Sequence, residues 1–200
     1  MKRIAVFGTH GAAKTTLIYK LAAFYKMENK NVTVIHEAAR QSPFPINTDV
    51  VYQTTLYVVT SQIKKELEAE AEGFEIAISD RTPSDAFVYL NHLERDNNLT
   101  QSLQNFCMEW ISKYDVLIYL EPSKGFAITN DNKRAIDVNY QLAIRDDFRL
   151  MLEEIEKKYE GKLQLIKAMS NQIFDKQKSH SLINEINRSC YASSREINLV

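Results

Sequence analysis

A nine-residue loop, GTHGAAKTT, constrains this chain more than any other feature of its sequence. The apolar run Ile4 to Phe7 precedes the loop and predicts a buried strand, and an amphipathic helix is expected from about Lys14 to Glu28. A glycine-containing loop that joins a strand to a helix and closes on Lys-Thr is the setting of a phosphate-binding loop. The loop consists of Gly8, Thr9, His10, Gly11, Ala12, Ala13, Lys14, Thr15 and Thr16.

Each part of this loop has a physical task in binding a nucleoside triphosphate. Glycine lets the backbone curl so that successive N–H groups point at phosphate oxygens, and the helix N-terminus adds partial positive charge. We expect Lys14 to reach the β- and γ-phosphates and the Thr15 hydroxyl to coordinate Mg²⁺. The sequence therefore predicts ATP and Mg²⁺ as cofactors, with residues 8–16 as the binding loop.

Two positions of the loop leave alternatives open. The common pattern G-x-x-x-x-G-K-[ST] has glycine where this chain has Ala13, and we expect its methyl group to be tolerated if φ is negative there. His10, at the loop tip, can touch the γ-phosphate or act as a spacer, and the spacer is the favoured interpretation. For the loop as a whole, the alternative is an ordinary strand-to-helix turn.

Apolar runs alternate with helical patterns along the whole chain. Short apolar strands separated by helices predict an α/β fold in which a parallel sheet is covered on both faces. We expect one domain over residues 1–200, with a loose tail from about residue 190. The expected strands lie at 4–7, 32–35, 75–79, 115–120 and 163–166, and the longer helices at 14–28, 49–72 and 137–159.

An acidic and a basic residue follow the third expected strand. Asp80 and Arg81 stand at its carboxyl end, and ligands bind at this edge of open α/β sheets. Asp80 can accept the proton of an acceptor hydroxyl or hold a Mg²⁺ water, and Arg81 can clamp phosphoryl oxygens. A structural ion pair is the alternative. Thr82 is expected to be the N-cap of the next helix and Asp85 its third residue, so Asp85 is assigned to capping.

Glu37 and Arg40 follow the second expected strand and should therefore face the same crevice. Glu37 can bind or deprotonate an acceptor hydroxyl, and Arg40 can hold an acceptor phosphate or ribose. A solvated ion pair is the alternative. We expect Glu37 to be the principal base and Asp80 to serve the metal, because the strand that carries Asp80 should adjoin the phosphate loop.

The segment 122–137 follows the fourth expected strand and has the polar, turn-rich composition of a lid. Within it, Arg134 can swing over the γ-phosphate and stabilise the charge of the transition state, as an arginine finger does. A solvated loop is the alternative interpretation.

Charge and apolar content limit the function classes. A formal net charge of −1 lacks the basic surface with which proteins hold nucleic acid by bulk electrostatics. No apolar stretch is long enough to span a bilayer and no secretion signal opens the chain, so we expect a soluble cytoplasmic protein without a membrane partner. Cys107 and Cys190 have no metal-ligand spacing. A homodimer is compatible with the sequence.

Four segments, taken in order, resemble a known group of kinases. They are the loop GTHGAAKTT, then EAAR, then SDRTPSDAFVYL, and the stretch NDNKRAIDVNYQ after DVLIYLEP. Together they resemble the AAA-type P-loop kinases related to the nicotinamide-riboside kinase domain of bifunctional NAD-synthesis regulators. They are similar, more distantly, to deoxynucleoside and thymidylate kinases. The resemblance covers roughly residues 2–170.

This resemblance implies a three-layer P-loop fold with a five-stranded parallel sheet, in the nucleoside-monophosphate-kinase arrangement, that uses ATP and Mg²⁺. The chain departs from the family pattern in two places. It has Ala13 where glycine is usual, and its lid has one clear arginine where related kinases often show several. The implied roles are phosphate and metal binding for Lys14 and Thr15, carboxylates near the acceptor for Asp80 and Glu37, a phosphate clamp for Arg81 and the lid arginine for Arg134.

Three functions are compatible with these residues. The favoured one is transfer of the γ-phosphate of ATP to a hydroxyl of a nucleoside, a nucleotide or nicotinamide riboside. The second is phosphorylation of a hydroxymethylated base within DNA, which would need a basic groove beside the crevice. The third is a nucleotide-binding regulator or ATPase without an acceptor. The carboxylates at two strand ends count against the third, since a switch protein does not need both.

Overall fold

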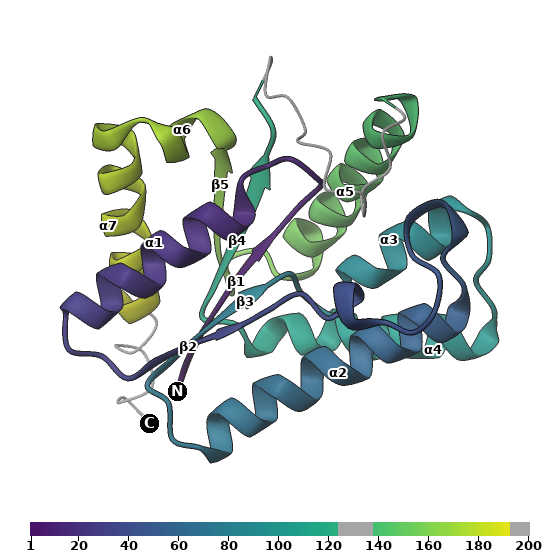
Figure 1. Ribbon diagram of the computed structural model, residues 1–200, viewed down its shortest axis with the longest axis horizontal. Helices are drawn as coiled ribbons and strands as arrows, with labels where there is room; N and C mark the ends of the chain where they lie inside the picture. The colour runs from purple at the N-terminus through teal and green to yellow at the C-terminus, as the bar shows by residue number, and fades with distance from the viewer. Residues whose placement is uncertain (124–137, 193–200) are drawn as a thin grey trace.

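The computed structural model describes residues 1–123 and 138–192 of the 200-residue chain. Its centre is a five-stranded sheet in the order β2-β3-β1-β4-β5 (Figure 1). All neighbouring strands pair in parallel. The strands are β1 (Lys2–Phe7), β2 (Val32–Ile35), β3 (Ile76–Asp80), β4 (Val116–Glu121) and β5 (Gln164–Met169).

Helices cover both faces of this sheet (Figure 1). They are α1 (Lys14–Met27), α2 (Tyr52–Ala71), α3 (Asp85–His92), α4 (Asn98–Trp110), α5 (Val138–Lys158), α6 (Ser170–Phe174) and α7 (Lys176–Ala192). Along β1, Ile4 and Val6 pack with α1, α6 and α7, whereas Ala5 and Phe7 pack with α3, α4 and α5. Because both faces of the strand are buried, its residues 4–7 form an uninterrupted apolar run.

This architecture confirms the predicted α/β fold, and all five expected strands are present. Helix α2 begins at Tyr52 instead of residue 49, because Asn47–Asp49 forms a separate turn of 3-10 helix. The loose tail expected from residue 190 is wrong for its first residues. Helix α7 continues to Ala192 because its apolar stripe, which ends at the fully buried Cys190, packs into the core.

The topology places the phosphate loop, which follows β1, beside the carboxyl end of β3. The expected lid lies almost entirely within residues 124–137, so the lid and its Arg134 are outside the described residues. Within residues 1–123 and 138–192, no helix is both long enough and apolar enough to cross a membrane.

Candidate active site

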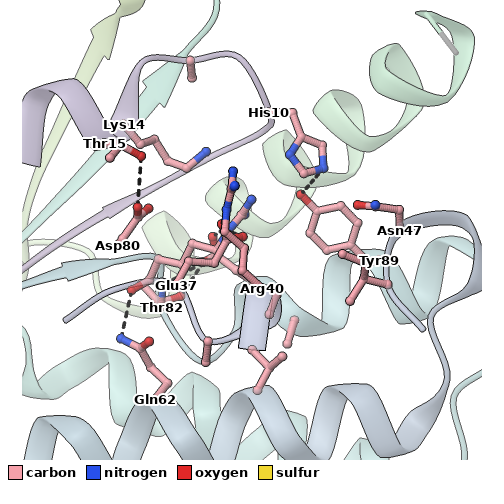
Figure 2. Close-up of a pocket in the computed structure, with 18 of the residues that line it drawn as sticks. His10, Lys14, Thr15, Glu37, Arg40, Asn47, Gln62, Asp80, Thr82 and Tyr89 are labelled. Carbon is pink, nitrogen blue, oxygen red and sulfur yellow. Dashed lines mark hydrogen bonds and ion pairs between the residues drawn. The ribbon is translucent and has the colours of Figure 1, made fainter. Parts of the chain in front are cut away.

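A cavity of about 320 Å³ lies where the carboxyl ends of β2 and β3 meet the phosphate loop (Figure 2). The loop contributes residues 10–16 to its walls, the segment after β2 contributes 37–40, and the end of β3 contributes 80–82. Helices α2 and α3, residues 46, 47 and 50 before α2, and Phe174 of α6 complete the walls. The parallel topology thus brings three of the motifs identified in the sequence to a single cavity.

The loop between β1 and α1 needs glycine at two positions. Gly8 has a φ of 127° and Gly11 a φ of 70°, in the left-handed half of backbone space that glycine adopts without strain. Space is a second reason at Gly8, where a Cβ atom would lie 2.4 Å from the Leu120 carbonyl oxygen of β4. Gly8 and Thr9 do not line the cavity, so they set the path of the loop without forming its inner wall.

Ala13 adopts a backbone conformation that the sequence did not predict. Its φ is 61° and its ψ is 27°, so the condition of a negative φ, under which the methyl group was expected to be tolerated, is not met. The chain turns from the loop into α1 at this N-cap residue, whose carbonyl oxygen accepts the Leu17 N–H at 3.1 Å. For a residue with a Cβ atom, this left-handed region costs about 1–2 kcal/mol.

Lys14 is the buried cation of the loop. Its Nζ donates to the Thr9 carbonyl oxygen at 2.8 Å. Burial, followed by the nearby charge of Arg81, lowers the pKa of Lys14 to about 8, and the Asp80 and Glu37 carboxylates oppose this shift. Burial removes water from around the Lys14 ammonium and so disfavours its charged form. An anion that enters the loop stabilises the charged form again.

Thr15, at the start of α1, and Asp80, the last residue of β3, meet at the wall of the cavity. Thr15 Oγ1 donates to Asp80 Oδ2 at 3.2 Å, and Asp80 pairs with Val6 in the β1–β3 register. Hydroxyl and carboxylate oxygens suit Mg²⁺, which usually combines one or two protein ligands with waters and substrate phosphates. The described residues contain no cluster of three or more His, Cys, Asp or Glu side chains that could hold a metal. This pair therefore fits a Mg²⁺ ion completed by phosphate and water.

Arg81 lies buried in the charged wall of the cavity. Its Nε donates to Glu37 Oε1 at 2.6 Å, and its Nη1 lies 3.4 Å from Asp85 Oδ2. Burial alone would lower the pKa of Arg81, but the Glu37 charge and its neighbours raise it well above the ordinary value. The backbone φ of Arg81 is 87°, a strained value for a residue with a side chain, and such strain is frequent at functional sites.

Glu37 has two cationic partners. Besides Arg81, the Nε of Arg40 donates to Glu37 Oε2 at 3.2 Å. Burial would raise the pKa of Glu37, but the charges of Arg81 and Lys14 outweigh burial and hold the pKa at about 2. Glu37 is therefore ionised at neutral pH and can accept a hydrogen bond from a hydroxyl. Arg40 is 42% exposed and forms the outer rim of the cavity.

Asp85 has the predicted capping contact and a second contact that the sequence did not reveal. Its carboxylate accepts the Thr82 N–H at 3.1 Å and the Thr82 hydroxyl at 2.7 Å, while its other oxygen faces Arg81. Burial raises the pKa of Asp85 in spite of that cation. Thr82 itself is not the N-cap: a tight turn, closed by the Asp85 N–H on the Thr82 carbonyl at 3.2 Å, precedes the helix, and Ser84 is the residue before α3.

His10 joins the loop tip to α3. Its Nε2 lies 3.2 Å from Tyr89 Oη, a contact that a dashed line marks in Figure 2. The Tyr89 ring lies 5.6 Å from Arg81 Cζ in a cation–π contact. Burial raises the pKa of Tyr89, so its hydroxyl keeps its proton at neutral pH. The spacer interpretation of His10 missed this contact, and no local pattern in the sequence marks Tyr89.

Helix α2 supplies polar wall residues that sequence reasoning also missed. Thr55 and Gln62 are buried, line the cavity and lie seven residues apart, which is two helical turns. Gln62 Nε2 donates to Glu66 Oε1 at 2.9 Å and to the Arg81 carbonyl oxygen at 3.4 Å. A signal was present, since Thr55 lies within the apolar first half of the helix and Gln62 directly follows that half.

Comparisons with known proteins agree with this fold. A family model described as an AAA domain matches residues 3–160. Solved structures that match the chain include a deoxyadenosine kinase from M. mycoides with bound dATP. The match has a TM-score of 0.67 at 18% sequence identity and covers 94% of this chain and 100% of the other, which shows a shared fold. None of the curated proteins matches the sequence.

Proposed function

This chain belongs to the AAA domain family, and we propose that it is an ATP-dependent kinase. The proposed reaction moves the γ-phosphate of ATP to a hydroxyl of a nucleoside, a nucleotide or nicotinamide riboside. The observation that carries this proposal is the Glu37–Arg81 pair, 2.6 Å apart, in the same cavity as Lys14. An ATPase without an acceptor needs the phosphate loop and a metal site, but no second carboxylate at the end of an outer strand.

On the phosphate side, Lys14 would pair with the β- and γ-phosphates, and Thr15 and Asp80 would hold Mg²⁺. When bound, Mg²⁺ neutralises phosphate charge as a Lewis acid. The hydrogen bond between Thr15 and Asp80 supports this assignment, because it keeps both oxygen atoms together in the cavity.

On the acceptor side, Glu37 would receive the hydrogen bond, and then the proton, of the attacking hydroxyl. A carboxylate with a pKa of about 2 is a weak base. A weak base suffices because phosphoryl transfer passes through a loose transition state, in which orienting the hydroxyl matters more than removing its proton early. Arg81 would hold Glu37 in place and share its remaining N–H groups with phosphoryl oxygens, Arg40 would bind the acceptor at the rim, and Arg134 stays the proposed lid arginine.

Two observations support a small acceptor of nucleoside size. The cavity volume of about 320 Å³ falls in the range of small-molecule sites. Apolar side chains of Ile46, Val50, Val58 and Ala86 line it beside the polar groups, which suits a flat ring with polar edges. The likeness to a deoxyadenosine kinase makes deoxyadenosine the first acceptor to test.

Transfer of a labelled γ-phosphate tests the proposal. The protein is incubated with γ-labelled ATP and Mg²⁺ and with nucleosides, nucleotides, nicotinamide riboside or hydroxymethylated DNA, and the products are separated. Label in a small acceptor supports the proposed kinase, and label in the polymer would assign the acceptor to DNA instead. Release of labelled phosphate with every acceptor unlabelled would overturn the proposal. A Lys14→Ala sample controls for contaminating kinases.

A further inference from the structure

A buried carboxylate behind the cavity gathers donors from several elements. Glu66 on α2 is 1% exposed. It accepts from Gln62 Nε2 at 2.9 Å, Ser79 Oγ at 3.0 Å, Tyr114 Oη at 2.7 Å and Trp110 Nε1 at 2.8 Å. These donors belong to α2, β3, α4 and the segment before β4. A carboxylate held from so many directions has a fixed position, and it fixes its partners in return.

Two acceptor atoms decide which way the Gln62 amide faces. Its Nε2 lies 2.9 Å from Glu66 Oε1 and 3.4 Å from the Arg81 carbonyl oxygen. A reversed amide would place its oxygen against these two oxygens and would deprive both of a donor. Both N–H groups of Gln62 are therefore used within the protein. Its Oε1 stays on the other side of the amide, at the wall of the cavity that Gln62 lines (Figure 2).

Thr55 provides a second polar group on the same face of α2. The side chain is 1% exposed and lines the cavity, and its Oγ1 has no hydrogen-bond partner within residues 1–123 and 138–192. Thr55 and Gln62 are separated by two turns, about 10 Å along the helix. Buried hydroxyl groups are normally hydrogen-bonded, so an unpartnered one at a cavity wall points to a ligand atom that completes it.

We propose that Gln62 and Thr55 bind the non-reacting end of the acceptor, and that Glu66 is the positioning residue that makes Gln62 a hydrogen-bond acceptor only. This inference rests on the proposed kinase function. The substrate class is then a nucleoside whose base presents an amino, amide or ring N–H group to Gln62 Oε1. A base with a lone pair or a carboxylate at that point would set two acceptors against each other, so the cavity rejects it.

Matched pairs of acceptors test the substrate class. One pair is 2′-deoxyadenosine and purine 2′-deoxyriboside, which lacks the amino group. The other is nicotinamide riboside and nicotinic acid riboside, in which a carboxylate replaces the carboxamide. We expect kcat/KM to be about 10- to 100-fold higher for the member with the donor. Equal kcat/KM within a phosphorylated pair would overturn this inference alone. Phosphorylation of no member of either pair would overturn this inference, whereas the kinase proposal is overturned only if every acceptor of the wider panel stays unlabelled.

Three variants test the roles of the residues. Gln62→Met removes the acceptor atom at similar length, and we expect it to bring the kcat/KM ratio of the preferred pair close to one. Glu66→Gln frees the Gln62 amide to turn, so the ratio should fall several-fold. Glu70→Gln is the matched control, because this carboxylate is one turn further along α2, is 57% exposed and pairs with Arg3.

The ratio of kcat/KM values is the readout because a purely structural role would change activity with both members of a pair equally. Melting temperatures report whether each variant is folded. If Glu66→Gln does not fold, Gln62→Met decides, and an unchanged ratio in folded Gln62→Met would overturn the inference. A ratio that also falls in the Glu70→Gln control would contradict the specific role of Glu66.

Discussion

Lys14 and Glu37 lie in one cavity, and the pKa values of both are lowered. Burial and the charge of Arg81 disfavour the Lys14 ammonium, whereas the same Arg81 charge and Lys14 itself favour the Glu37 carboxylate. The Lys14 shift therefore comes mainly from burial, whereas the Glu37 shift reports the positive charges of Arg81 and Lys14. These positive charges beside the cavity attract phosphate and keep Glu37 ionised.

Replacing Lys14 by alanine should remove phosphoryl transfer without unfolding the protein. The ammonium is preorganised in the loop, and losing such a contact costs about 3–4 kcal/mol of transition-state stabilisation, or about 10²- to 10³-fold in kcat. The measurement is the rate of labelled phosphate transfer, with melting temperature as the folding check. Lys26→Ala, an exposed lysine of the same helix, is the control. A folded Lys14→Ala protein with the wild-type rate would contradict the loop assignment.

Replacing Ala13 by glycine should stabilise the protein and preserve ATP binding. Ala13 has a φ of 61°, and glycine removes the strain of that conformation, although it adds entropy to the unfolded chain. The net gain should be up to about 1 kcal/mol in the free energy of unfolding, measured by denaturant titration. Ala12 has no positive φ, so Ala12→Gly should be destabilising. Loss of ATP affinity in Ala13→Gly, measured by calorimetry, would show that the loop assignment needs revision.

At the scale of elements, the site depends on how closely β1 and β4 approach each other. Gly8→Ala should destabilise the protein more than Gly73→Ala. Both glycines have positive φ, but the new Cβ atom meets the Leu120 carbonyl at 2.4 Å at Gly8 and no atom within 4 Å at Gly73. The difference between the two variants in the free energy of unfolding isolates the steric clash at Gly8, which should cost more than about 1 kcal/mol. Equal losses in the two variants, measured by denaturant titration, would argue against a close approach of β4.

The order of β2, β3 and β1 separates the roles of the two strand-end carboxylates. Asp80 adjoins the loop and bonds Thr15, whereas Glu37 follows the edge strand β2 and bonds Arg81. Glu37→Gln should lower kcat by about 10²-fold or more while ATP affinity is unchanged. Asp80→Asn should also raise the Mg²⁺ concentration needed for half-maximal turnover. Titration of Mg²⁺ against turnover checks both, and a changed metal requirement in Glu37→Gln alone would reverse the assignments.

At the scale of the whole molecule, stability against acid should depend on Glu37. Its pKa is about 2 in the folded protein, against an ordinary value of 4.5. A carboxyl group with a depressed folded pKa stabilises the fold above pH 4.5, and this contribution is lost as the pH falls from 4.5 to 2. The contribution at neutral pH is about 3 kcal/mol. Urea unfolding of wild type and Glu37→Gln at several pH values should therefore show a difference in stability that shrinks below pH 4.5.

The control for this measurement is Glu72→Gln, which removes an exposed carboxylate that does not line the cavity. A wild-type advantage over Glu37→Gln that stayed constant from pH 7 to pH 2 would contradict the strong Arg81–Glu37 pair.

Lys14 should affect the stability of the fold at alkaline pH. Its folded pKa of about 8 lies below the ordinary 10.5. Burying the charged Lys14 therefore lowers the free energy of unfolding below pH 8, and this loss disappears as the pH rises from 8 to 10.5.

The sequence by itself determined the local parts of this protein. The phosphate loop is a contiguous segment, so its strand, glycines, lysine and threonines could be recognised from their spacing. The five strands follow from apolar runs, and a parallel sheet places Glu37, Asp80 and Arg81 at one edge whatever the details of packing. Arg134 stays a prediction, because it lies outside the described residues.

Only the tertiary structure decided which side chains meet. The partners of Arg81 and His10 are 44 and 79 residues away along the chain, and those pairings depend on how β2 and α3 pack against the loop. The positive φ of Ala13 follows from the turn into α1, and the identity of that residue alone does not predict it. The Glu66 network joins four elements, so it exists only once they are assembled around a common core, where a buried charge must find all of its donors.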